Sequence, residues 1–108
     1  MLYKLARSGE LAPFLGAVWP LAAYDRERGG DLLRTLRAFF ECGENVSRAA
    51  EALFLHRNSV PYRLERVREL TGLDYRDHDQ RLALELGLLA LEEYTPEQER
   101  REDEDERA

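Results

Sequence analysis

Polar and cationic side chains recur at helical spacing between residues 58 and 66, and their chemistry suits contacts with nucleic acid. Asn58 can satisfy the donor and the acceptor of adenine together, and the planar guanidinium groups of Arg63 and Arg66 can pair with phosphate or with guanine. The hydroxyl groups of Ser59 and Tyr62 suit backbone phosphates. The same arginines could equally be solvated surface or partners of carboxylates one helical turn away. The residue types alone leave both interpretations open.

Two short helices are predicted to position these side chains. The first begins after Asn45, a favourable N-cap, and ends near Leu53. The second has an apolar face opposite the polar one. Apolar residues at helical spacing define the two buried faces: Val46, Ala49, Ala50 and Leu53 in the first helix, and Val60, Leu64 and Val67 in the second. Two such helices joined by a short break form the helix-turn-helix layout of DNA-binding domains.

These residues also carry a family resemblance. The run LHRNSVPYRLERVRELTGLD resembles the most characteristic segment of the C-terminal helix-turn-helix domain of PucR/CdaR-type bacterial transcriptional regulators. It has a His-Arg-Asn-Ser start, then Tyr-Arg-Leu, then Leu-Thr-Gly, and the wider match covers about residues 25–91. The resemblance implies an all-α fold, a small helical bundle with a helix-turn-helix motif, that binds operator DNA.

The candidate DNA contacts lie in the two helices and the break between them, with a recognition helix at about residues 57–70. They are Ser47, Arg48, His56, Arg57, Asn58, Ser59, Tyr62, Arg63 and Arg66. Double-stranded operator DNA is the partner that this set predicts. The domain is expected to sense no small-molecule effector and to need no cofactor and no metal.

Pro61 departs from the family pattern and affects the start of the second helix. If that helix began just after His56, Pro61 would remove an intrahelical hydrogen bond and kink the helix. If Asn58 or Ser59 is the cap, Pro61 falls in the first turn, where proline is tolerated. We favour a delayed or distorted first turn.

The charge of the chain is concentrated at its C-terminal end. The 108 residues carry a net charge of −6. Residues 1–91 hold thirteen basic and thirteen acidic side chains, whereas residues 92–108 hold three arginines against nine acids. We therefore predict one helical domain over residues 1–94, with its helix-turn-helix core at about 31–74, and a disordered acidic tail over 95–108. The tail either confers solubility or folds back on the arginine face as a mimic of DNA.

Four further helical segments are predicted around the motif. Asp31 is the expected N-cap of a helix over about residues 32–42, and upstream apolar residues predict a short helix that Pro20 stops and a second over about 21–28. A leucine-rich helix over about 79–94 is apolar on more than one face. Its leucines could pack within the domain, which we favour, or against a second copy in a homodimer.

Several function classes are disfavoured by the sequence. It lacks an apolar stretch long enough to span a membrane and a signal peptide, so a cytoplasmic location is expected. No catalytic motif is present, and the cluster at Asp74, Asp77, His78 and Asp79 lacks the spacing of a metal site, so we predict no enzyme. Sequence-specific DNA binding is the favoured function. The alternative is a small helical protein-interaction module that pairs with and modulates a regulator.

Overall fold

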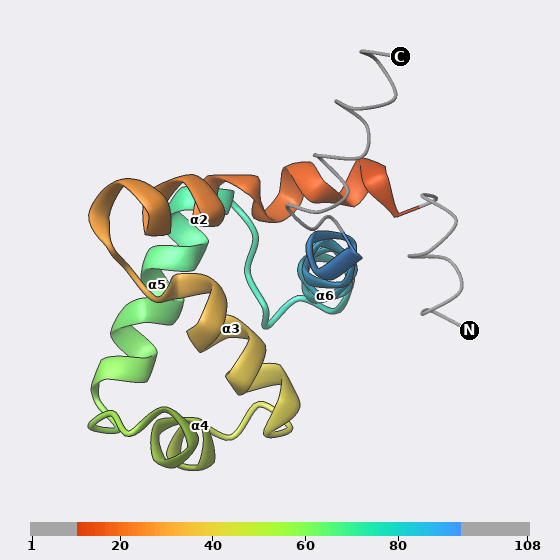
Figure 1. Cartoon of the computed structure of the whole chain (residues 1–108). Helices are drawn as coiled ribbons and strands as arrows, with labels where there is room; N and C mark the ends of the chain where they lie inside the picture. The colour runs from red at the N-terminus through yellow and green to blue at the C-terminus, as the bar shows by residue number, and fades with distance from the viewer. Residues whose placement is uncertain (1–10, 94–108) are drawn as a thin grey trace.

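The computed structural model describes residues 11–93, which fold into a small all-α domain (Figure 1). The elements are the 3-10 helix η1 (Ala12–Phe14) and the α-helices α2 (Leu15–Arg28), α3 (Leu32–Glu41), α4 (Val46–Leu53), α5 (Ser59–Thr71) and α6 (His78–Glu93). No strand occurs between residues 11 and 93, which confirms the predicted fold class. The predictions for Tyr94, for the tail over 95–108 and for the first ten residues lie outside the described residues.

The helix-turn-helix unit consists of α4 and α5, with α3 packed behind both (Figure 1). α2 contacts α3, α5 and α6 and so joins the unit to the last helix. The shared core contains the predicted apolar residues of α5, together with Ala49 and Ala50 of α4 and apolar residues of α3, and Val46 packs against it. Its buried members within these three helices are Leu32, Leu36, Phe39, Ala49, Ala50, Val60, Leu64 and Val67. This core holds α5 in place from behind and leaves its opposite face in solvent.

The starts of α4 and α5 lie where the capping residues predict them. The Asn45 side chain accepts a hydrogen bond from the Arg48 backbone N–H at 3.0 Å and begins α4. α4 ends at Leu53, and its C-cap Phe54 adopts a left-handed conformation with φ 57°. α5 begins at Ser59, so Pro61 is its third residue and lies in the first turn. The delayed start of the second helix is thus confirmed.

Pro20 does not stop a helix, and the prediction of two separate helices before Gly29 was wrong. α2 continues through Pro20 from Leu15 to Arg28. Proline at this position removes one backbone hydrogen bond, but Val18 and Leu21 on either side of it are completely buried. Burial of these two side chains contributes roughly 1.5–3 kcal/mol each, which offsets the backbone cost of about 3 kcal/mol.

Asp31 precedes α3 as predicted, but its side chain does not cap the helix. The cap comes from Asp25 in α2, whose two carboxylate oxygens accept hydrogen bonds from the backbone N–H groups of Leu32 and Leu33 at 2.9 and 3.0 Å. Sequence spacing cannot reveal this cap, because Asp25 lies in a different helix. The Asp31 carboxylate is consequently left available for other partners.

α6 packs mainly into the domain itself. Leu84, Leu88 and Ala90 are buried, whereas Leu82 is 43% exposed. The Asp77 carboxylate accepts the Gln80 backbone N–H at 3.0 Å and caps the start of this helix. None of the helices between residues 11 and 93 is long and apolar enough to cross a membrane.

Gly87 allows α6 to approach α2 closely. A Cβ atom added at Gly87 would lie 2.8 Å from a methyl group of Val18 and 2.9 Å from the backbone oxygen of Phe14. We therefore expect Gly87→Ala to lower the free energy of unfolding by about 1–3 kcal/mol, because the two helices must separate. Chemical denaturation would measure the loss. Gly16→Ala is the matched control, since no atom lies within 4 Å of its added Cβ; an equal loss in both variants would contradict the close packing.

Candidate nucleic-acid interface

The α4–α5 connection and the first turn of α5 form a polar, exposed edge of the domain. His56, Arg57 and Asn58 are exposed, and Tyr62 is 71% exposed. The His56 Nδ1 atom accepts a hydrogen bond from the Asn58 backbone N–H at 3.1 Å. A backbone N–H can only donate, so Nδ1 is the accepting nitrogen in this contact. The connection therefore presents the exposed His56 ring beside the Asn58 side-chain amide, which has no hydrogen-bond partner within the described part of the chain.

Two exposed arginines of this region lack an acidic partner among residues 11–93. Arg48 lies in the first turn of α4 beside Ser47, and Arg57 lies in the connection to α5. Neither forms an ion pair with a carboxylate of the described chain. Their charges are consequently available to phosphate groups without the loss of an existing contact.

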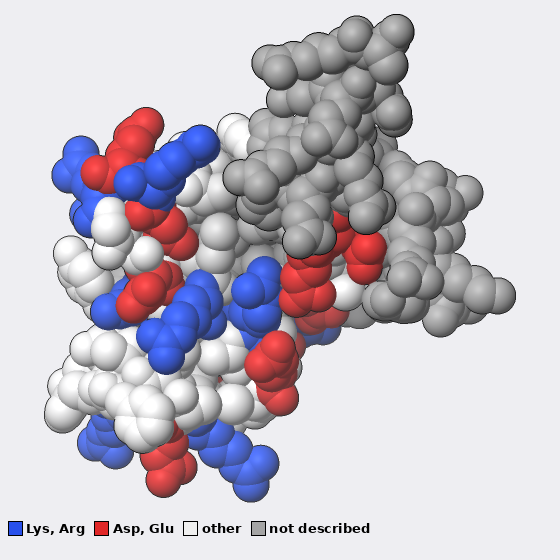
Figure 2. Space-filling model, in the orientation of Figure 1, with Lys and Arg blue, Asp and Glu red and all other residues white. Residues whose placement is uncertain are grey.

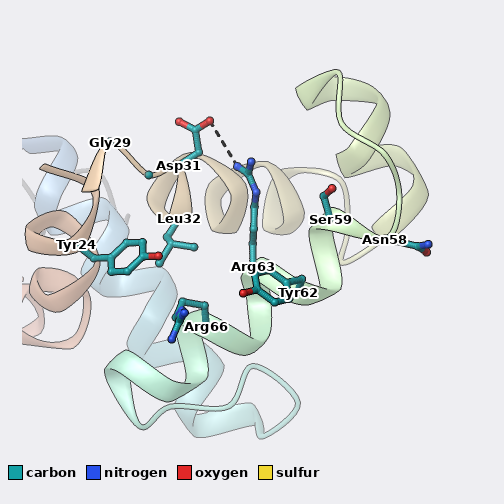
Figure 3. Close-up of a pocket in the computed structure, with 10 residues that line it drawn as sticks. Tyr24, Gly29, Asp31, Leu32, Asn58, Ser59, Tyr62, Arg63 and Arg66 are labelled. Atoms are coloured by element: carbon teal, nitrogen blue, oxygen red, sulfur yellow. Dashed lines mark ion pairs between the residues drawn. The ribbon is translucent and has the colours of Figure 1, made fainter. Parts of the chain in front are cut away.

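Arg63 is on the flank of α5 that faces α3. One of its terminal nitrogens lies 3.5 Å from the Asp31 carboxylate and donates a hydrogen bond to the Thr35 hydroxyl at 3.3 Å (Figure 3). Thr35 is fully buried and donates its own proton to the Asp31 backbone oxygen at 2.7 Å. The Arg63 side chain is only 27% exposed. The Arg63 side chain is therefore less exposed than its spacing along the helix predicted, and it has more polar partners.

Arg66 lies further along α5 and is also partnered. It donates to the Glu69 carboxylate at 3.1 Å, and its guanidinium carbon lies 5.9 Å from the centre of the Tyr24 ring. The neighbouring Tyr24 hydroxyl, followed by Glu69, raises the pKa of Arg66. On another side of α5, a hydrogen bond from Arg68 lowers the pKa of Glu65. Both carboxylates on this half of α5 are therefore paired with an arginine of the same helix.

A groove of about 550 Å³ separates the first turns of α5 from the turn between α2 and α3 (Figure 3). Figure 3 shows Arg63 and Arg66 reaching from α5 toward Asp31 and Tyr24 respectively, while Asn58 points away from the groove. The groove is lined by Tyr24, Gly29, Gly30, Asp31, Leu32, Asn58, Ser59, Tyr62, Arg63 and Arg66. The structure thus brings Ser59, Tyr62, Arg63 and Arg66 together on one flank, whereas Ser47 and Arg48 belong to α4.

Basic and acidic side chains are interspersed on the face seen in Figure 2, and no large area of that face carries a single sign of charge.

Sequence reasoning missed two residues of the candidate interface. Phe54 is 93% exposed in the connection, and Tyr24 approaches α5 from α2. No periodicity identifies Phe54 as exposed, because it directly follows the apolar stripe of α4. The contact of Tyr24 depends on tertiary packing.

A short helix, a tight connection and a second helix with a solvated polar first turn, supported from behind by a third helix, define a helix-turn-helix domain. The chain belongs to the family of PucR C-terminal helix-turn-helix domains, whose model matches residues 32–90. The family resemblance in the sequence is thereby confirmed. The domain is one of transcriptional regulators and not an enzyme.

Curated relatives support this assignment. The chain is 45% identical over 67 residues to the carbohydrate diacid regulator of Escherichia coli K12, a match covering 62% of this chain and 17% of the regulator. It is 35% identical to the proline-responsive transcriptional activator PutR of Bacillus subtilis, over 66% of this chain and 17% of PutR. It is 32% identical to the purine catabolism regulatory protein of the same species, over 81% of this chain and 16% of that protein.

The aligned segment spans less than a fifth of the length of each of these relatives. The shared region is therefore the helix-turn-helix domain, and the comparison does not extend to the rest of those regulators. No solved structure matches the chain.

Proposed function

We propose that the domain binds double-stranded operator DNA in a sequence-specific manner, with the first turn of α5 entering the major groove. The observation that carries the proposal is the exposed edge between α4 and α5. Between residues 11 and 93, the Asn58 side-chain amide there has no hydrogen-bond partner, and the Arg57 guanidinium forms no ion pair. An asparagine amide can pair with both polar atoms of an adenine edge, and an arginine can neutralise phosphate or read guanine.

The N-terminal end of α5 suits the approach to bases better than its C-terminal half. Asn58 and Tyr62 are exposed at the beginning of the helix, whereas the next two turns contain the acidic residues Glu65 and Glu69. Carboxylates repel DNA phosphates, even when they are partly neutralised by Arg66 and Arg68. Helix-turn-helix proteins generally contact base edges with the N-terminal residues of the second helix.

The start of α4 supplies contacts to the phosphate backbone in this proposal. Ser47 and Arg48 lie in the first turn of α4 and are exposed. The amino end of a helix carries partial positive charge, which adds to the charge of Arg48 in attracting phosphate. These contacts would set the position of α5 on the duplex without reading sequence.

A homodimer would extend the proposed function. A single recognition helix covers few base pairs, and twofold dimers read two half-sites about one helical turn apart, which multiplies the affinity of one module. Leu82 of α6, 43% exposed, is a candidate for that contact. The effector would then be sensed by another part of the regulator.

Arg57→Ala tests the proposal through the salt dependence of binding. We expect the slope of log K against log salt concentration to become less negative by about 0.9, because one phosphate contact is lost. Fluorescence anisotropy would measure it on a duplex selected by the chain from a random library and on a scrambled duplex. Arg76→Ala is the matched control, since Arg76 pairs with Asp74 beyond the far end of α5.

Equal effects of the two variants would show that general charge, and not this edge, attracts the duplex. If the folded wild-type chain bound neither duplex, the proposal would fail. The protein-interaction module would then be favoured, and Leu82→Ala should weaken its association with a partner.

A further inference from the structure

We propose that the groove between α5 and the α2–α3 turn is a second binding site for the DNA backbone. In this site Asp31 forms an ion pair with Arg63 until a phosphodiester group replaces the Asp31 carboxylate. The inference rests on the proposed function and specifies which side of the domain holds the second strand. It assigns Arg63 and Arg66 to backbone phosphates of that strand, and it makes Asp31 an intramolecular competitor of DNA for Arg63.

The groove collects hydrogen-bond donors of the kind that bind phosphate. Arg63 and Arg66 lie three residues apart on α5 and both line the groove. In Figure 3 Arg63 reaches toward Asp31, whereas the Arg66 guanidinium lies away from Asp31. Ser59 and Tyr62 add two hydroxyl groups from α5, and Tyr24 adds a third from α2 on the opposite wall. The volume of about 550 Å³ is ample for a phosphate group with its flanking sugars.

The contact between Arg63 and Asp31 identifies the position of an anion in this groove. The Asp31 carboxylate is free to make it because Asp25 caps α3 in its place. The nitrogen–oxygen distance is 3.5 Å, and the second pair of Asp31, with Arg34, is 3.8 Å. Charge-assisted hydrogen bonds are usually about 2.7–2.9 Å, so both contacts are loose. Asp31 is also half exposed, with a side chain 48% accessible to solvent. An incoming phosphate can therefore displace it at little cost.

The arrangement of the domain favours a DNA phosphodiester over a small phosphate. An α-helix in the major groove, which is about 12 Å wide, has one backbone strand on each side. Arg48 at the start of α4 contacts one strand in the proposed docking, and the groove between α5 and the α2–α3 turn is lined by none of the α4 residues. A free phosphate dianion would be repelled by Asp31 and by Glu69 beside Arg66. A phosphodiester carries a single charge and is held by its neighbours along the strand.

A double-mutant cycle between Asp31 and Arg63 tests this competition. We expect Asp31→Asn to tighten binding of the selected duplex by about twofold to fivefold, the fold-change that corresponds to breaking one exposed ion pair. Arg63→Ala should weaken binding and reduce the salt slope by about 0.9. In the Arg63→Ala background, Asp31→Asn should not change the affinity for the duplex, because Asp31 then no longer competes with DNA for Arg63. Thermal melting of each variant establishes that it is folded under the binding conditions.

Three results would overturn the inference. If Asp31→Asn increased the affinity for the duplex in the Arg63→Ala background as well, the increase would reflect only the removal of a negative charge. Unchanged salt slopes in both Arg63→Ala and Arg66→Ala would place no phosphate in the groove. Competition by millimolar inorganic phosphate at constant ionic strength would identify a small phosphate ligand instead of the DNA backbone.

The cycle separates failure of this inference from failure of the proposed function. If Arg57→Ala reduces the salt slope while Arg63→Ala and Arg66→Ala do not, the domain binds DNA without using the groove. If the wild-type chain shows no duplex binding, the proposed function fails first. Arg76→Ala again controls for loss of one positive charge.

Discussion

Replacing Phe39 by alanine is expected to lower the free energy of unfolding by about 3–5 kcal/mol, the range for loss of a buried aromatic side chain. Phe39 is 1% exposed at the centre of the core shared by α3, α4 and α5. Its ring packs edge-on against Tyr75 with 4.9 Å between the ring centres. The substitution removes this contact and leaves a cavity behind α5.

Chemical denaturation would measure this loss, and Phe54→Ala is its matched control. Phe54 is 93% exposed, so the same change of residue type should alter stability by less than about 0.5 kcal/mol. Comparable losses in both variants would contradict the arrangement in which one phenylalanine forms the core and the other lies in solvent.

Asn58→Ala is expected to cause the largest functional loss, a reduction in base discrimination of about 1–3 kcal/mol, or roughly fivefold to 150-fold. The reason is that its exposed amide is the side chain best suited to reading adenine at the start of α5. The measurement is the ratio of dissociation constants for the selected duplex and for duplexes with one base pair changed.

Asn45→Ala provides the comparison for Asn58→Ala. Asn45 caps α4 through the Arg48 backbone N–H, so its loss should cost about 1 kcal/mol of stability and leave the discrimination ratio unchanged at temperatures where the domain is folded. If Asn58→Ala lowered affinity for every duplex equally, Asn58 would contact the backbone and not a base.

The helices of the motif could be predicted from the sequence because local signals agree there. Asn45 is both a favourable cap and the observed cap, and the stripe from Val46 to Leu53 matches one buried face. Pro61 is tolerated only near a helix start, and α5 begins two residues before it. Capping chemistry and apolar periodicity therefore located these two helices without tertiary information.

The errors arose where contacts between distant residues override local preference. Pro20 is a helix breaker by local chemistry, but the burial of Val18 and Leu21 keeps α2 continuous. Asp31 has the residue type and position of a cap, yet Asp25 reaches the same backbone groups from the preceding helix. Neither result follows from spacing along one segment.

The sequence predicted the residue types at the candidate interface, but it did not predict all of their contacts. Arg57 and Asn58 are exposed as a reading surface requires. Arg63 has the same chemistry in the sequence, but in the fold it lies against Thr35 and Asp31. Helical spacing gives the direction of a side chain from its own helix, and it cannot say which neighbouring helix that side chain meets.

Amide chemical-shift mapping most directly tests whether the α4–α5 edge contacts duplex DNA, as we claim. Isotope-labelled chain would be titrated with the selected duplex. We predict the largest shifts at Ser47, Arg48 and residues 56–59, with Tyr62 and the groove beside it shifting in the same titration. Shifts confined to α6, with the α4–α5 edge unchanged, would contradict the claim.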